Sequence, residues 1–143
     1  MKVEDVVAVA TGKASLVLDP DPEFRARLNA SVNQLGARLE RGGRVYGVTT
    51  GFGEACLNEV QDDHVSDLPT NLMRFHGCGT GRILEPEESA AVVVSRVASL
   101  VTGWSATRPV VLEAMCGLLQ AGLTPCIPAE GSVGASGDLT PLS

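Results

Sequence analysis

Two stretches of this chain have the composition of helices that are apolar around most of their circumference. They are residues 86–101, which contain "SAAVVVSRVASLV", and residues 109–121, "PVVLEAMCGLLQA". A helix without a wide polar face has to be buried on several sides, by a large core or by neighbouring subunits. A chain of 143 residues can hardly bury two such helices and also cover its other elements. We therefore expect it to be part of a larger helical assembly.

The rest of the chain carries the start and stop signals of further helices. Asp21-Pro22 combines an N-cap residue with a proline in the first helical position, and Gly42-Gly43 supplies a stop. Pro69 is expected to interrupt or kink its helix. Glycines predict an ordered, partly extended loop in "RVYGVTTGFGEACL" and a break in "GCGTGRILEP". The further predicted helices are residues 3–11, 22–40 and 63–75, so the fold class is mainly α with little sheet.

The composition excludes several classes of function. A net charge of -6, with Lys2 and Lys13 as the only lysines, would repel nucleic-acid backbones. Four cysteines without CxxC spacing suit reduced thiols in a cytoplasmic protein. No apolar run approaches the roughly 20 residues that span a bilayer, so we expect a soluble protein that binds neither nucleic acid nor membrane. His76 and Cys78 lack the nearby companions that a zinc site needs, and no metal is expected.

The end of the chain, "GSVGASGDLTPLS", combines residues that suit a reaction of the backbone with itself. In a tight bend, the unhindered Gly137 nitrogen can attack the carbonyl carbon of Ala135 and close a five-membered ring through Ser136. Loss of one water from the ring and of a second from the serine side chain leaves a methylidene group, which is an electrophile. Taken alone, the tripeptide Ala-Ser-Gly is explained as well by a loop with a helix cap.

Taken whole, this string closely resembles the signature of the aromatic amino acid ammonia-lyases and aminomutases, a family that includes histidine, phenylalanine and tyrosine ammonia-lyases. Two more motifs of that family lie upstream in the same order, "YGVTTGFG" at residues 46–53 and "NLMRFHGCG" at residues 71–79. The resemblance spans the chain from "VEDVVAVATGKASLVLD" onward. It implies the N-terminal part of the large helical ammonia-lyase fold, with glycine-rich active-site loops.

The resemblance also implies roles for five residues. Ala135, Ser136 and Gly137 would cyclise to 4-methylidene-imidazole-5-one (MIO), the prosthetic group of the family. Tyr46 matches the catalytic tyrosine, which removes the β-hydrogen of the substrate while MIO holds the amine. A free tyrosine has a pKa of about 10, so this base needs nearby hydrogen-bond donors or a positive potential. His76 matches a substrate-binding position at which family members select their substrate.

Both Tyr46 and His76 also have explanations that involve no catalysis. Tyr46 could be a tyrosine packed beside a glycine turn. His76 could be a histidine whose ring is satisfied by a neighbouring backbone carbonyl. These alternatives stay open at the level of the sequence.

The residues around these motifs favour a substrate with a polar ring. An imidazole at residue 76 can hydrogen-bond a phenol or an imidazole, whereas relatives that act on phenylalanine tend to have an apolar residue there. Thr49 stands where many histidine lyases have asparagine and where tyrosine enzymes often have threonine. Pro69 replaces a frequent glutamine, and Phe75 is typical of phenylalanine lyases. Tyrosine is therefore the favoured substrate, with histidine and phenylalanine as alternatives.

Members of the family are much longer than this chain, and they are mostly homotetramers whose active sites combine several subunits. The family's later tyrosine, asparagine, arginine and glutamate positions are absent here. Thr140-Pro141 is typical of a helix start, yet only two residues follow it. We therefore expect residues 1–143 to be the N-terminal, MIO-bearing part of an ammonia-lyase, truncated after the Ala-Ser-Gly loop and inactive on its own.

Three functions remain in competition. The favoured one is an ammonia-lyase that converts an aromatic L-amino acid to an α,β-unsaturated acid and ammonia. A 2,3-aminomutase, which returns the ammonia to the β-carbon, would use the same residues. A non-catalytic assembly fragment would use its apolar helices for oligomerisation and leave residues 135–137 uncyclised.

Overall fold

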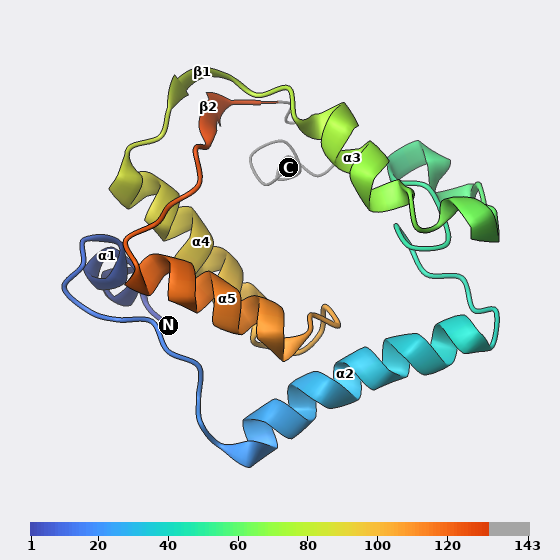
Figure 1. Cartoon of the computed structure of the whole chain (residues 1–143), viewed down its shortest axis with the longest axis horizontal. Helices are drawn as coiled ribbons and strands as arrows, with labels where there is room; N and C mark the ends of the chain where they lie inside the picture. The colour runs from blue at the N-terminus through green and yellow to red at the C-terminus, as the bar shows by residue number, and fades with distance from the viewer. Residues whose placement is uncertain (132–143) are drawn as a thin grey trace. The chain divides into compact units, whose positions relative to one another are not determined.

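The computed structural model describes residues 1–131, apart from the side chain of Asp62, and divides the chain into two compact units (Figure 1). Unit 1 comprises residues 1–36 and 84–126, and unit 2 comprises residues 37–83 and the chain from Ile127 onward. The residues predicted to form MIO, Ala135, Ser136 and Gly137, lie outside the described residues, as does the helix start predicted at Thr140-Pro141.

The described residues are mainly helical, which confirms the predicted fold class. Their elements are, in chain order, α1 (Val3–Ala10), α2 (Pro22–Glu40), the 3-10 helices η1 (Gly53–Leu57) and η2 (Asp62–His64), α3 (Leu68–His76), β1 (Thr80–Ile83), α4 (Pro86–Leu100), α5 (Pro109–Gln120) and β2 (Pro128–Glu130).

The signals at the ends of α2 act as the sequence predicts. The Asp21 carboxylate accepts a hydrogen bond of 2.8 Å from the Glu23 N–H, so it caps the helix that Pro22 begins. At the other end, Gly42 takes a φ of +67°, in the left-handed region that glycine enters without strain. The apolar stripe on the helix is buried or half-buried along its length, and its residues are Phe24, Leu28, Val32, Leu35 and Leu39.

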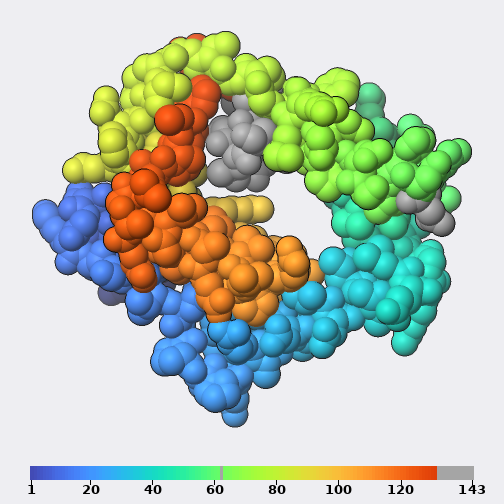
Figure 2. Space-filling view, in the orientation of Figure 1, coloured from blue at the N-terminus to red at the C-terminus, as the bar shows by residue number. Residues whose placement is uncertain are grey.

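Unit 1 is built on α1, α4 and α5 with the first part of α2. The helix α4 contacts both α1 and α5, and α5 covers much of the face of α4 that is turned towards the viewer (Figure 2). Leu28, Leu100 and Leu112 form the centre of the core. A second set of partly buried side chains packs around them, namely Leu18, Phe24, Val101 and Met115.

The two apolar helices differ in how much of their surface unit 1 buries. Five residues of α4 are buried, but only Leu112 and Cys116 of α5 are. On α5, Val110 and Leu118 are 57% and 48% exposed. Within the described residues, α5 is therefore not covered on several sides, and the larger assembly that the sequence predicts for it stays a prediction.

Unit 2 differs from the sequence predictions in three stretches. The predicted helix 63–75 is divided into η2 and α3, and Pro69 lies in the first turn of α3 instead of kinking a longer helix. The reason is that a proline in the first turn removes no helical hydrogen bond. The stretch "RVYGVTTGFGEACL", predicted to be a loop, contains the short helix η1, which begins at Gly53 and so places that glycine at a helix end.

The predicted break "GCGTGRILEP" contains the strand β1, which was also not expected. It pairs antiparallel with β2 in the register Thr80 to Glu130 and Ile83 to Pro128. Glycine permits this conformation, because Gly81 has a φ of +79°, in the left-handed region that other residues rarely adopt.

Candidate active site

The loop that carries Tyr46 is closed by main-chain hydrogen bonds at its base. Thr50 and Glu59 form an antiparallel bridge. Next to it, the Gly51 N–H donates to the Asn58 carbonyl at 3.1 Å and the Val60 N–H donates to the Thr49 carbonyl at 2.9 Å. These contacts bring the two ends of residues 49–60 together, so the loop is an ordered structure.

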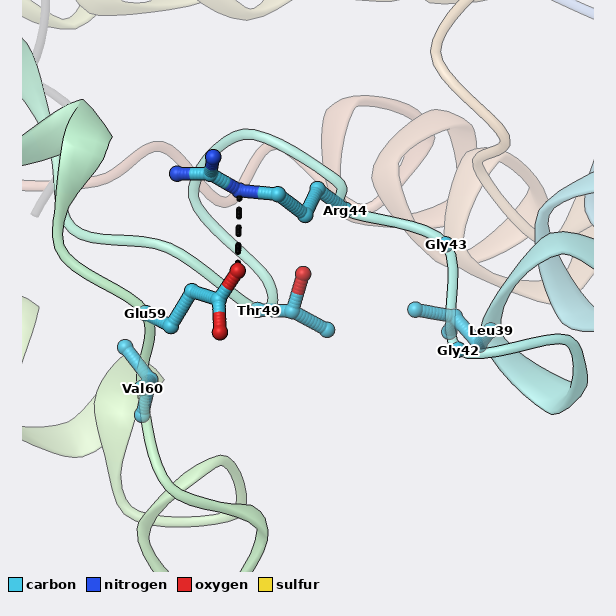
Figure 3. A pocket seen from close by; sticks show the side chains of 7 residues that line it. All are labelled: Leu39, Gly42, Gly43, Arg44, Thr49, Glu59 and Val60. Carbon is cyan, nitrogen blue, oxygen red and sulfur yellow. Dashed lines mark ion pairs between the residues drawn. The ribbon is translucent and has the colours of Figure 1, made fainter.

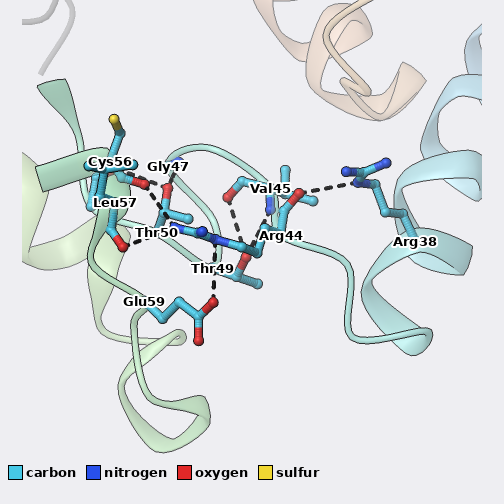
Figure 4. Close-up of polar contacts among 10 residues, drawn as sticks. Arg38, Arg44, Val45, Gly47, Thr49, Thr50, Cys56, Leu57 and Glu59 are labelled. Atoms are coloured by element: carbon cyan, nitrogen blue, oxygen red, sulfur yellow. Dashed lines mark hydrogen bonds and ion pairs between the residues drawn. The ribbon is translucent and has the colours of Figure 1, made fainter.

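Two threonine hydroxyls hold the first turn of this loop. Thr49 Oγ1 accepts a hydrogen bond of 2.9 Å from the Val45 N–H. Thr50 Oγ1 accepts from the Gly47 N–H at 3.2 Å and donates to the Gly51 carbonyl at 3.0 Å. Thr50 is only 3% exposed, and its buried hydroxyl is satisfied by two backbone groups of the turn (Figure 4). These bonds fix the backbone on both sides of Tyr46.

Glycine is required at two positions of the loop. Gly47 has a φ of +71°, and a Cβ there would lie 2.6 Å from the Phe52 ring. At Gly51 a Cβ would lie 2.7 Å from the Ala55 carbonyl oxygen. Both distances are shorter than any normal contact, so the aromatic ring and η1 can approach the loop only because these side chains are absent.

Tyr46 lies in this loop with its ring accessible and its hydroxyl held. The phenol oxygen accepts a hydrogen bond of 2.9 Å from the Gly53 N–H. The Phe52 ring meets the tyrosine ring edge to face, with centroids 6.1 Å apart and an interplanar angle of 88°. Tyr46 is nevertheless 64% exposed. A donor therefore faces the oxygen that would carry negative charge if the phenol lost its proton, and the ring remains open to a ligand.

Arg44 ties the start of the loop to its end. Its Nη2 donates to the carbonyls of Cys56 and Leu57, at 3.3 and 2.9 Å, and its Nε lies 3.3 Å from a Glu59 carboxylate oxygen (Figure 4). The Arg44 carbonyl in turn accepts from Arg38 Nε at 3.2 Å. No role for this arginine was predicted from the sequence. Its position two residues before Tyr46 was visible, but its partners lie twelve and thirteen residues away.

A small cavity of about 160 Å³ opens beside this arginine (Figure 3). Arg44 and Glu59, whose side chains form an ion pair, both line it, and neither Tyr46 nor His76 does. Its volume is below the roughly 300 Å³ at which ligand pockets begin. The lining residues are Leu39, Gly42, Gly43, Arg44, Thr49, Glu59 and Val60.

His76 is the last residue of α3, and its ring is already engaged on one side. Its Nδ1 lies 3.0 Å from the carbonyl oxygen of Leu72, one turn earlier in the same helix. A carbonyl can only accept, so in the neutral ring this contact selects the tautomer with the proton on Nδ1 and a lone pair on Nε2. This is the backbone contact that the sequence analysis gave as the alternative to a substrate role. It does not exclude that role, because Nε2 remains able to accept a hydrogen bond.

Tyr46 and His76 both lie in unit 2, but no hydrogen bond or ring contact joins them within residues 1–131. Over the same residues, His, Cys, Asp and Glu side chains form no group of three that could hold a metal ion. Among the described helices, none is both long enough and apolar enough to cross a membrane.

The chain matches the family model for aromatic amino acid lyases over residues 1–143. It is 40% identical over its whole length to the MIO-dependent tyrosine 2,3-aminomutase of Streptomyces globisporus, of which it covers 26%. It is 41% identical over 98% of its length to the tyrosine ammonia-lyase of Cupriavidus metallidurans, again covering 26%. The crystal structure of the Streptomyces globisporus tyrosine aminomutase superimposes with a TM-score of 0.87 and 37% identity, over 99% of this chain and 26% of that one.

The fold, and the loop that carries Tyr46, are therefore those of a class of enzymes that includes ammonia-lyases and aminomutases. This chain belongs to the aromatic amino acid lyase family and corresponds to its N-terminal portion. The resemblance inferred from the motifs is confirmed. The chain spans about a quarter of the length of the curated relatives named above.

Proposed function

We propose that this chain is the N-terminal part of an ammonia-lyase that removes the α-amino group of an aromatic L-amino acid, with tyrosine as the favoured substrate. The observation that carries this proposal is the exposed Tyr46 phenol, whose oxygen accepts the Gly53 N–H at 2.9 Å within the family motif of residues 46–53. The complete enzyme is the longer polypeptide of which this chain would be the N-terminal part.

In this proposal Tyr46 is the base that takes the β-hydrogen of the substrate. A base has to lose its own proton first, and the Gly53 N–H donates to the atom that would then carry the charge. The donor belongs to the backbone, and it is held in place by the ordered loop of residues 44–60. It is therefore preorganised and needs no rearrangement when charge develops.

Residues 135–137 would form MIO, which when present supplies the electrophile that takes up the amine of the substrate. The chemistry of the described residues fits such a group. An accessible tyrosine base supplies a proton acceptor, and the His76 ring, whose Nε2 has no hydrogen-bond partner among residues 1–131, supplies a polar-ring contact. Neither side chain is itself an electrophile. No metal is needed for this division of roles.

His76 would determine which ring the site accepts. With the proton on Nδ1, its Nε2 can accept a hydrogen bond from the phenol O–H of tyrosine or from the imidazole N–H of histidine. The ring of phenylalanine has no such donor. A site with an unpaired polar group discriminates strongly against a substrate that leaves it unpaired, so a polar ring is favoured and phenylalanine is the least favoured substrate.

The test is the product mixture of the complete enzyme with tyrosine, histidine and phenylalanine, compared between the unaltered enzyme and the His76→Leu variant. We expect deamination of tyrosine in the unaltered enzyme and a gain of phenylalanine over tyrosine in the variant. If His76→Leu leaves the ratio of kcat/KM values unchanged, His76 is a structural residue that caps α3 and does not select the substrate.

An aminomutase is the second candidate, and one specific observation favours it. The relative from Streptomyces globisporus, 40% identical over the whole chain, is a tyrosine 2,3-aminomutase. Formation of a β-amino acid from tyrosine by the complete enzyme would establish this function in place of the lyase.

For the lyase and for the aminomutase alike, we propose a homotetramer whose active sites are shared between subunits. A complete enzyme that deaminates and isomerises none of the three amino acids would instead support the assembly fragment.

A further inference from the structure

We propose that Arg44 is a positioning residue for Tyr46, acting through the short helix η1. This inference rests on the proposed function, because it assumes that Tyr46 is the base. Among the described residues, no hydrogen bond joins the side chains of Arg44 and Tyr46. Arg44 contacts the far end of η1, and the first residue of that helix holds the tyrosine hydroxyl.

The path from Arg44 to the tyrosine hydroxyl consists of hydrogen bonds at both ends of η1. Arg44 Nη2 donates to the carbonyls of Cys56 and Leu57, the last two residues of the helix. At the other end, the Gly53 N–H donates to Tyr46 Oη at 2.9 Å. The guanidinium thus fixes the C-terminal end of a five-residue helix whose N-terminal residue supplies the donor.

Besides the contacts of Arg44, η1 is held by main-chain hydrogen bonds of its neighbours Gly51 and Asn58, and burial contributes little. None of its residues is buried, and Leu57 is 78% exposed. A 3-10 helix has poorer hydrogen-bond geometry than an α-helix and is stable only in short pieces. Its last carbonyls have no partner within the helix, and a charged donor makes stronger hydrogen bonds to them than a neutral one. Contacts at its end should therefore have a large influence on where Gly53 lies.

The two carbonyls matter more in this proposal than the ion pair with Glu59. The side chains of Arg44 and Glu59 are 49% and 69% exposed, and exposed ion pairs contribute little to stability. The fork of the guanidinium, in contrast, can bind two carbonyl oxygens and a carboxylate at once, which the single ammonium of lysine cannot do with the same geometry. Arg44→Lys should therefore fail to restore the contacts, although it keeps the charge.

The experiment measures four variants of the complete enzyme: Arg44→Met, Arg44→Lys, Glu59→Gln and Arg41→Met. Arg41 is the matched control, because it is an exposed arginine that forms no hydrogen bond or ion pair with the described residues. For each variant we would measure kcat and KM with the best amino-acid substrate. Hydrogen exchange of a peptide covering residues 47–57, followed by mass spectrometry, reports on the loop independently of activity.

A misplaced catalytic group costs up to about a hundredfold in rate. We expect Arg44→Met to lower kcat by about ten- to a hundredfold and to change KM by less than about threefold, because the interaction is made with the base and not with the substrate. Exchange in the 47–57 peptide should accelerate by about tenfold. Arg44→Lys should resemble Arg44→Met, and it provides the same test if Arg44→Met does not fold. Glu59→Gln and Arg41→Met should stay within about threefold of the unaltered enzyme.

The proposal is wrong if Arg44→Met and Arg44→Lys keep the unaltered kcat, or if the exchange of residues 47–57 does not change. It is also wrong if Arg41→Met lowers kcat as much as Arg44→Met, since the effect would then be one of surface charge. A Tyr46→Phe variant separates this failure from that of the proposed function. Full activity of Tyr46→Phe refutes the role of Tyr46 as the base, whereas a loss of activity there with an unaffected Arg44→Met refutes only the role of Arg44.

Discussion

Gly47 is the position at which the structure makes its sharpest prediction about the Tyr46 loop. Replacing it by alanine adds a Cβ to a residue with a φ of +71° and places that atom 2.6 Å from the Phe52 ring. The first effect costs about 1–2 kcal/mol for a residue other than glycine. The second is a case of overpacking, which costs about 1–3 kcal/mol.

Gly53 provides a control that separates these two costs. It also has a positive φ, +57°, but a Cβ there would meet no atom within 4 Å. Gly53→Ala should therefore lose stability only through backbone strain, and it keeps the N–H that donates to the Tyr46 hydroxyl. The difference between the two variants isolates the clash with Phe52, and we expect Gly47→Ala to be the worse by about 1–3 kcal/mol.

The assay is hydrogen exchange of the 47–57 peptide together with kcat of the complete enzyme. Because 1.4 kcal/mol corresponds to a factor of about ten, exchange in Gly47→Ala should exceed that in Gly53→Ala by about five- to 150-fold. The kcat of Gly47→Ala should fall as well, since the Phe52 ring that packs on Tyr46 has to move. Equal exchange and equal activity in the two variants would refute the close approach of Phe52 to Gly47.

Three further predictions concern unit 1. Leu112→Ala should lower the free energy of unfolding by about 2–5 kcal/mol in thermal denaturation, because Leu112 is fully buried in the core; the half-exposed Leu118 should tolerate the same change with a loss below about 1 kcal/mol. Ala106 has a φ of +49°, so Ala106→Gly should raise the melting temperature by relieving strain worth up to about 1 kcal/mol, and a lower melting temperature would contradict this. Burial raises the pKa of the Cys116 thiol, so less of it is thiolate at neutral pH. Alkylation of Cys116 in the native chain should therefore need a higher pH than alkylation of the exposed Cys78 and Cys126. Peptide mapping of the alkylated protein measures this difference.

The ends of the helices could be predicted because the residues that decide them are adjacent in the chain. Asp21 caps the helix that Pro22 begins, and Gly42 ends it with a positive φ. The strand β1 could not be predicted, since it depends on pairing with Pro128–Glu130 almost fifty residues later, and its glycines indicate a break when they are considered locally. Long-range pairing of this kind leaves no local signal.

The candidate site was predictable to a similar, partial extent. The motif of residues 46–53 predicts Tyr46 as the base, and the sequence alone predicts the chemistry of Ala135, Ser136 and Gly137; both stay predictions. The donor on the tyrosine hydroxyl could not be inferred, because it is a backbone N–H seven residues away. Arg44 was missed for the same reason: its partners are backbone carbonyls, and a carbonyl has no residue type that a motif could display.

The central claim is that residues 135–137 form an electrophile on which the activity of the complete enzyme depends. The most direct measurement combines the mass of the peptide 131–143 from the active enzyme with the activity of a Ser136→Thr variant, which cannot form the unsubstituted methylidene. We predict a peptide that is lighter than its sequence by two water molecules, and a variant that has lost deamination. An unmodified peptide from the active enzyme, or a Ser136→Thr variant that still deaminates its amino acid at the original rate, would contradict the account.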